Sequence, residues 1–104
     1  GLPANTMKLG FEWDTNKAKG NHKKHQVSFE EAITVFNDPL LVTFPDEYHY
    51  DREERLISIG LSALNKILLV VHTEHEQSED VVIIRIISCR RATASERRTY
   101  EEGE

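Results

Sequence analysis

The sequence predicts a single α+β domain, an antiparallel β-sheet with helices packed on it in the order β-α-α-β-β-β-β-α. Three β-rich runs fill the second half of the chain, and the loops between them are too short for parallel crossovers, which predicts an antiparallel meander. Two capping boxes, Ser28 with Glu31 and Thr93 with Glu96, indicate where helices begin. A chain of 104 residues is long enough to bury one hydrophobic core and is the usual size of one domain.

The first half of the chain predicts one strand and two helices. Apolar and polar residues alternate from Leu9 to Trp13, the pattern of an edge strand with one buried face. Asp14 is a suitable N-cap for a short, basic and largely solvated helix that reaches His25. The next helix carries apolar residues at helical spacing from Phe29 to Phe36 and stops at Asp38-Pro39.

The second half predicts four strands and a final helix. A short apolar run is ended by a proline, an acidic loop follows, and three longer β-rich runs and a capped helix complete the chain. The predicted strands cover residues 40–44, 55–62, 66–74 and 81–89, and the predicted helix covers residues 94–102. We expect Gly1 to Thr6 to be a cloning remnant, because Met7 follows directly, and the domain to occupy residues 7–104.

Composition excludes several classes of protein. Cys89 is the single cysteine, so there is neither a disulfide framework nor a cysteine cluster for zinc, and a reducing cytoplasm fits best. No apolar run approaches the roughly 18 residues that a membrane span needs. The glycine patterns of phosphate and dinucleotide loops and the serine hydrolase motif are absent. We therefore expect a protein without membrane association and without a cofactor.

Charge is distributed unevenly around a formal total of -5. The segment 8–25 holds five lysines against two acidic residues, whereas the segment 30–54 is strongly acidic. Arginines outnumber acidic residues again from Arg85 onward. Because phosphate binds to a local basic patch rather than to the net charge of the chain, the acidic total does not exclude a nucleic-acid partner.

Histidines suggest a metal site only weakly. His22 and His25 lie three residues apart on the predicted helix and would face the same side, but no HExxH or paired-cysteine pattern accompanies them. We interpret His22, His49 and His75 as solvated side chains and expect no metal.

Arginines near the last strand suggest an anion site. Arg85 interrupts an apolar run in mid-strand, where an unpaired buried charge would cost several kcal/mol, roughly, so it must face solvent or a partner. Arg90 and Arg91 follow at the end of the strand, and the final helix adds more cations and an aromatic hydroxyl, a combination suited to binding phosphate and a base. The predicted RNA-binding residues of this helix are Arg97, Arg98 and Tyr100. The alternative is a purely structural set of salt bridges to Glu74, Glu76 and the acidic loop.

Cleavage of RNA without a metal needs a base for the 2′-hydroxyl, a cation for the phosphate and an acid for the leaving oxygen. His72 and Glu74 occupy alternate positions of one predicted strand, so they share a face, and either could accept a proton. Lys24, His25 and the arginines could stabilise the additional charge on phosphate.

The ordered motifs of the chain resemble the BrnT family of bacterial toxins. The likeness runs from about Leu9 to Glu102 and rests on these segments: Phe11-Glu12-Trp13-Asp14, Lys17-Ala18, Lys24-His25, Val27 to Ala32, Phe36-Asn37-Asp38-Pro39 and Ile84 to Thr93.

The resemblance implies a small RelE-like ribonuclease of a type II toxin-antitoxin system that inhibits translation. Its partner would be a BrnA-type antitoxin with a ribbon-helix-helix domain, through which the complex would reach DNA only indirectly. The positions that match the family motifs, and that we take as catalytic candidates, are Lys24, His25, Arg55, His72, Glu74, Arg85, Arg90 and Arg91. The chain departs from the family where Thr73-Glu74-His75 stands in place of Thr-Glu-Arg, which removes one cation.

Two other functions remain open at this point. The same fold could serve as a non-catalytic module that binds RNA or protein, because loss of cleavage would leave the strand pattern intact. The chain could also be chiefly an interaction subunit whose basic patch binds an acidic partner segment.

Overall fold

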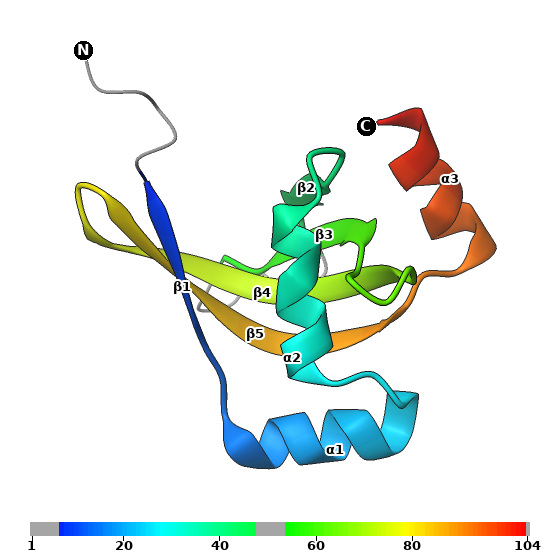
Figure 1. Ribbon diagram of the computed structural model, residues 1–104, viewed down its shortest axis with the longest axis horizontal. Helices are drawn as coiled ribbons and strands as arrows, with labels where there is room; N and C mark the ends of the chain where they lie inside the picture. The colour runs from blue at the N-terminus through cyan, green and yellow to red at the C-terminus, as the bar shows by residue number, and fades with distance from the viewer. Residues whose placement is uncertain (1–6, 48–53, 104) are drawn as a thin grey trace.

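The computed structural model describes residues 7–47 and 54–103 (Figure 1). The expected cloning remnant and part of the predicted acidic loop, including His49, lie outside these residues. The elements in chain order are β1 (Lys8–Glu12), α1 (Thr15–His25), α2 (Phe29–Ala32), the 3₁₀ helix η2 (Ile33–Asn37), β2 (Val42–Pro45), β3 (Leu56–Leu61), β4 (Ile67–Ser78), β5 (Val81–Arg91) and α3 (Ala94–Glu102).

The described strands form one sheet in the order β1-β5-β4-β3-β2, and the α+β class is confirmed. The four strands from β2 to β5 make the predicted antiparallel meander. The prediction of a wholly antiparallel sheet is wrong, because β1 runs parallel to β5, with Lys8 opposite Val81 and Glu12 opposite Arg85. This pairing joins segments about 70 residues apart, so no short-loop argument applies to it.

The second predicted helix also differs, which changes the predicted order in detail. α2 ends after Ala32 and the chain continues as the 3₁₀ helix η2. The run Ile33-Thr34-Val35 is β-branched, and the Thr34 hydroxyl donates to the Glu31 carbonyl at 2.6 Å. Both features disfavour a regular α-helix.

The predicted caps of α1 and α3 are present, whereas at α2 only the Ser28 half of the predicted capping box is present. Asp14 caps α1, and Thr93 and Glu96 form the complete capping box of α3. Ser28 accepts from the Glu31 amide at 3.0 Å, but the Glu31 carboxylate does not complete the box. That carboxylate instead bonds Ser62 and Lys66 in the β3–β4 turn, and it thereby fastens α2 to the turn.

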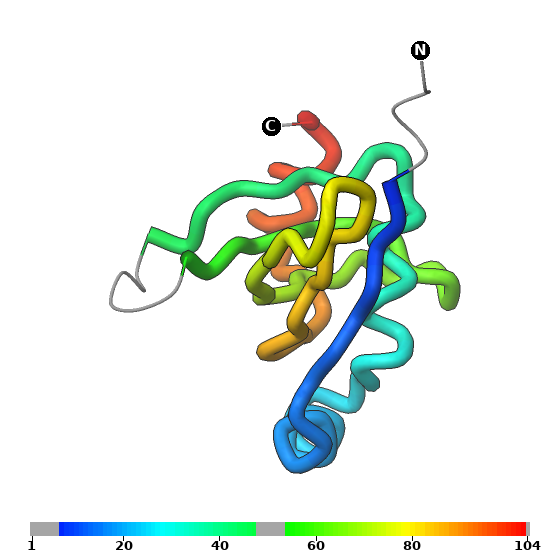
Figure 2. The backbone as a smooth tube through the Cα atoms, turned by 90° about the vertical axis from the view of Figure 1, so that its left-hand side faces the viewer, coloured from blue at the N-terminus to red at the C-terminus, as the bar shows by residue number. Residues whose placement is uncertain are grey.

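The sheet buries apolar residues on both faces. α2 crosses one face (Figure 1), where Phe29 and Val35 pack on Leu68, Val70 and the buried part of β5. On the other face, Ile59 and Leu69 pack with Tyr100 of α3. The backbone tube in Figure 2 shows α1 below the strands, where β1 leads into it, and α2 on one side of them. We call the two faces the α1 face and the α3 face.

A β-bulge in β5 decides which side chains lie on which face. The register between β5 and β4 shifts by one residue here, so no residue of β4 lies opposite Ile87. Arg85 and Arg90 are five residues apart and would point to opposite faces of a regular strand. Because of the bulge, both lie on the α3 face, where they are opposite Thr73 and Leu69.

A substitution at Gly60 tests the contact between η2 and β3. A Cβ atom there would lie 2.7 Å from Leu41 Cδ1 and 3.2 Å from Val35 Cβ. We expect Gly60→Ala to lower the free energy of unfolding by about 1–3 kcal/mol, measured by denaturant titration, because this region is tightly packed. Gly20→Ala is the matched control: apart from its chain neighbours and the backbone of its own helix, nothing lies within 4 Å of its Cβ position, and alanine in the middle of α1 should stabilise the protein by about 0.5–1 kcal/mol. An unchanged stability of Gly60→Ala would contradict the packing described here.

Candidate functional site

Asn21 fixes the last turns of α1 against the end of β5. Its side chain is almost fully buried and donates from Nδ2 to the carbonyls of Cys89 at 2.9 Å and Val27 at 3.1 Å, while Oδ1 accepts from the Cys89 amide at 3.0 Å. The neighbouring Cys89 thiol is buried, and burial raises its pKa to about 11, so it is a structural group. The basic C-terminal turn of α1 is therefore held where β5 ends.

Arg91 lies on the α1 face of this end. It is opposite Leu68, whose side chain belongs to the α1-face core, and it follows Cys89 by two residues. Lys24 and His25 occupy the last turn of α1, which Asn21 attaches to the same strand end. Lys24 and Arg91 are exposed, His25 is half-buried, and neither cation has an ion pair within residues 7–47 and 54–103.

Arg90 lies on the opposite face and is already paired. Its Nη1 and Nη2 atoms contact the two carboxylate oxygens of Glu96 at 2.7 and 2.9 Å. This bidentate bond, together with the bonds from Thr93, lowers the pKa of Glu96 to about 2. The predicted salt-bridge alternative thus applies to Arg90, but with Glu96 of α3 as partner rather than Glu74 or Glu76.

Tyr100 attaches α3 to the rest of the domain. Its hydroxyl donates to Asp38 Oδ2 at 2.6 Å, and this bond raises the pKa of Tyr100 to about 12. Asp38 also accepts from the amides of Leu40 and Leu61, so one carboxylate links η2, β3 and α3. The ring packs against the α3-face core. Arg97 and Arg98 are exposed on α3 and make no ion pair with any described residue.

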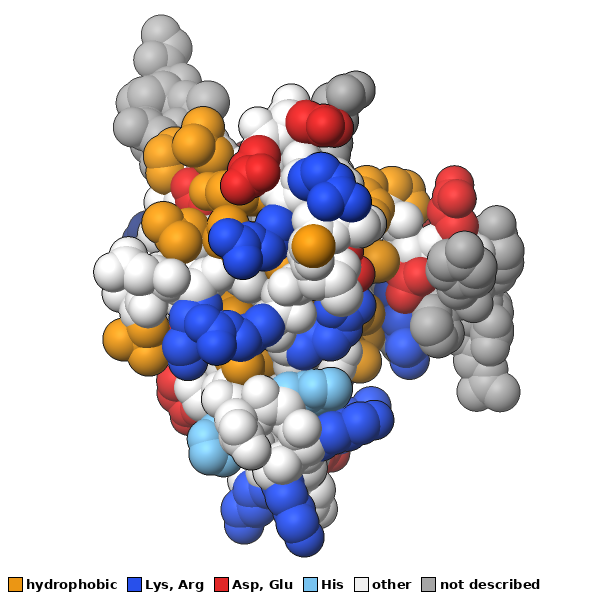
Figure 3. All heavy atoms as spheres, turned by 90° about the vertical axis from the view of Figure 1, so that its right-hand side faces the viewer, with side chains coloured by type: hydrophobic (Ala, Val, Ile, Leu, Met, Phe, Trp, Pro, Cys, Tyr) orange, Lys and Arg blue, Asp and Glu red, His pale blue; other side chains and the backbone are white. Residues whose placement is uncertain are grey.

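Positive side chains therefore gather at one end of the molecule. Figure 3 shows this end, with lysines and arginines over the centre and histidines beside lysines at the lower end, which α1 forms. We define the basic end as Lys24, His25, Arg90, Arg91, Arg97 and Arg98.

Arg85, Glu74 and Arg55 lie away from the basic end. Arg85 pairs with Glu12 at 3.1 Å, and both side chains are about half exposed. Glu74 lies opposite Ile84, and thus on the other face from Arg85. It lines an acidic hollow of about 270 Å³ with Glu54, Glu76 and others, a poor place for phosphate. Arg55 precedes β3 at the end that pairs with His72, and its carbonyl accepts from the Asp46 amide.

His72 is part of the core. It lies on the α1 face with Glu74, as predicted, but its side chain is fully buried. Its ring packs edge-to-face against Phe36, with the two ring centroids 5.0 Å apart. Nε2 lies 2.7 Å from the hydroxyl of Ser58, which is itself bonded to Thr43. Burial lowers the pKa of His72 to about 4, so the ring is neutral at physiological pH and has no access to substrate.

Sequence reasoning missed two residues that organise this region. Asn21 falls in a segment whose polar composition predicts a solvated helix, and a buried amide leaves no periodic signal in the sequence. Glu96 was recognised as a capping residue, but its second role as the partner of Arg90 depends on the fold. Within residues 7–47 and 54–103, no group of three or more His, Cys, Asp or Glu side chains is placed to hold a metal ion. No helix of that part is long and apolar enough to span a membrane.

Comparison with known proteins identifies a family and a similar solved structure. Residues 13–96 match the family described as the ribonuclease toxin BrnT of type II toxin-antitoxin systems. Among solved structures, the chain is similar to the ribonuclease toxin BrnT of Brucella abortus, with a TM-score of 0.61 and 22% identity over 83% of this chain and 99% of that one. At this identity the likeness concerns the fold. No curated protein sequence matches the chain.

The burial of His72 predicts a specific acid sensitivity. Folding lowers the pKa of His72 from 6.5 to about 4, so between these pH values the unfolded chain binds a proton that the folded protein does not. The stability that the neutral ring contributes is therefore complete above pH 6.5 and is lost as the pH falls from 6.5 toward 4. Denaturant titration should show a loss of up to about 3 kcal/mol over this range. His72→Gln should flatten that part of the profile, whereas exposed His75→Gln should leave it unchanged. A wild-type profile that is flat from pH 7 to 4 would disprove the assignment.

Proposed function

The chain belongs to the BrnT family of ribonuclease toxins of type II toxin-antitoxin systems, and from this premise we propose that it cleaves RNA without a metal ion at the basic end. We propose further that it acts as a RelE-like endoribonuclease in the bacterial cytoplasm and inhibits translation there. The observation that carries the proposal is the set of exposed cations Lys24, Arg91, Arg97 and Arg98, none of which is paired among the described residues. Like charges that gather in one place repel one another, so a cluster of exposed cations is suited to an anionic ligand.

His25 is our candidate for the acid-base group. It is the histidine of the predicted set that lies at the basic end with its side chain partly accessible, whereas His72 is buried. Imidazole is the side chain that most often transfers protons in enzyme reactions. We propose that His25 takes the proton from the 2′-hydroxyl as the 2′-oxygen attacks the adjacent phosphorus.

The bond between phosphorus and the 5′-oxygen then breaks, and the leaving oxygen takes a proton from the imidazolium or from water. The products are a 2′,3′-cyclic phosphate and a 5′-hydroxyl. Lys24 and Arg91 would stabilise the additional negative charge, because both extend from the same junction of α1 and β5 as His25. Arg90 is held by Glu96 and would contribute less charge.

The other candidates receive different roles in this proposal. Arg85 and Arg90 share the α3 face, so RNA bound at the basic end could continue along β5 to Arg85. We therefore assign Arg85, Arg97 and Arg98 to binding of the RNA backbone. His72 and Tyr100 stabilise the fold, and we assign no chemical step to Glu74 or Arg55.

An antitoxin must mask this surface. We propose a BrnA-type partner whose acidic or extended segment covers the basic end and excludes RNA by competition, with its own ribbon-helix-helix domain contacting DNA. The exposed cations would speed that encounter, so association should slow as salt rises.

Cleavage by the free protein tests the proposal directly. We expect a labelled RNA to be cut in excess EDTA, and we expect His25→Gln to reduce the rate about 100-fold or more, because general acid-base catalysis contributes that much. His75→Gln is the matched control, since His75 is exposed on β4 outside the basic end. Cleavage that requires a divalent ion would refute metal independence. Binding without any cleavage would support the non-catalytic RNA-binding module instead.

Arg85→Ala separates RNA binding from a structural ion pair. The Arg85–Glu12 pair is exposed, so the variant should lose no more than about 0.5 kcal/mol of stability. We expect it to raise KM several-fold with little change in kcat, whereas Arg91→Ala should lower kcat. Parallel losses of folding and activity in Arg85→Ala would favour a structural role.

A further inference from the structure

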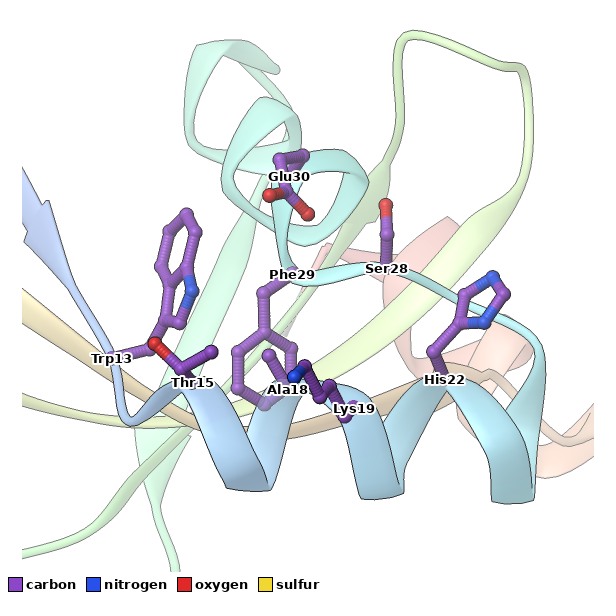
Figure 4. A pocket seen from close by; sticks show the side chains of 8 residues that line it. All are labelled: Trp13, Thr15, Ala18, Lys19, His22, Ser28, Phe29 and Glu30. Atoms are coloured by element: carbon purple, nitrogen blue, oxygen red, sulfur yellow. The ribbon is translucent and has the colours of Figure 1, made fainter.

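A groove separates α1 from the start of α2, beside the basic end. It has a volume of about 430 Å³ and is open to solvent. Figure 4 shows Trp13 standing at one end of the groove, His22 at the other, and Phe29 and Ala18 between them. The floor is therefore apolar and partly aromatic, as in many sites that bind planar ligands.

Trp13 is held in a fixed orientation at this groove. Its indole packs edge-to-face on Phe29, with ring centroids 5.9 Å apart, and Phe29 is fully buried in the α1-face core. Trp13 itself is only partly buried. A half-exposed aromatic ring with a rigid support is a suitable stacking platform for an unpaired base.

The polar rim carries both signs of charge. Lys19 and His22 project from α1, while Glu30 belongs to the first turn of α2 on the other side (Figure 4). All three are exposed, and none makes an ion pair within the described part of the chain. The rim thus offers a carboxylate that can accept hydrogen bonds and a lysine that can contact phosphate.

The groove is continuous with the basic end along α1. That helix contains Lys17, Lys19, Lys23 and Lys24 and no acidic residue. The groove residues Ala18 and His22 precede His25 by at most seven positions, which is about 10 Å along the helix axis. A strand of one or two nucleotides spans such a distance, so one RNA molecule could occupy both places.

We propose that this groove binds an unpaired guanine of the RNA substrate and thereby selects where the strand is cut. The inference rests on the proposed function, because it assigns a subsite to the same substrate. Guanine presents two adjacent N–H donors, on N1 and N2, to a single carboxylate, and Glu30 can accept both while the base stacks on Trp13. Adenine, cytosine and uracil lack that donor pair, so they would bind less tightly.

Fluorescence of Trp13, the single tryptophan of the chain, reports on this site. The probes are short oligoribonucleotides with 2′-O-methyl groups, which cannot be cleaved, containing either one guanine or none. We expect the guanine probe to quench the fluorescence and to bind about 10-fold or more tightly than the others. Glu30→Gln should abolish that preference, whereas Glu79→Gln, an exposed carboxylate in the β4–β5 turn, should preserve it.

The outcomes distinguish this inference from the proposed function. Equal quenching by all probes, or a guanine preference that survives Glu30→Gln, would overturn the guanine subsite. Quenching by an acidic peptide but by no RNA would mean that the groove binds a protein. Cleavage that depends on His25 but occurs equally in RNA without guanine would leave the proposed function intact and refute the subsite. A guanine preference without any cleavage would support the subsite and refute the proposed enzyme.

Discussion

The buried amide of Asn21 is the interaction on which the arrangement of this molecule depends. β1 pairs with β5 only as far as Arg85, so beyond that residue no strand of the described part of the chain pairs with the outer side of β5. Asn21 supplies the missing partners for the amide and carbonyl of Cys89 and also bonds Val27 after α1. Unpaired buried backbone groups are costly, so α1 is fixed there and not elsewhere along the sheet. The position of Lys24 and His25 follows from this one contact.

The bulge at Ile87 is the second constraint, because it places Arg85 on the same face as Arg90. Strand alternation then places the next residue, Arg91, on the opposite face. Arg91 joins α1, whereas Arg90 joins Glu96 on α3. The two helices therefore contribute cations to one strand end from opposite sides. Since exposed cations at that end have no partners among the described residues, their field is available to an anionic chain such as RNA.

Local signals in the sequence predicted the helices and the meander, and long-range contacts account for the errors. Caps such as Asp14 and Thr93 act within three residues, so they are visible in the sequence. The parallel pairing of β1 depends on contacts about 70 residues apart, and the bulge depends on packing. The candidate site shows the same limit: alternation placed His72 and Glu74 on one face, but only the packing of Phe36 shows that His72 is buried. The alternation of apolar and polar residues also does not show that Arg85 lies away from the basic end.

The central claim is that α1 and the end of β5 form one RNA-binding surface. Amide chemical-shift mapping with a 2′-O-methylated oligoribonucleotide tests it most directly, because the RNA binds without being cut. We expect the largest chemical-shift changes to occur together in residues 19–25 and 90–98. Shifts confined to the hairpin of residues 74–83, or the absence of shifts at low salt, would contradict it.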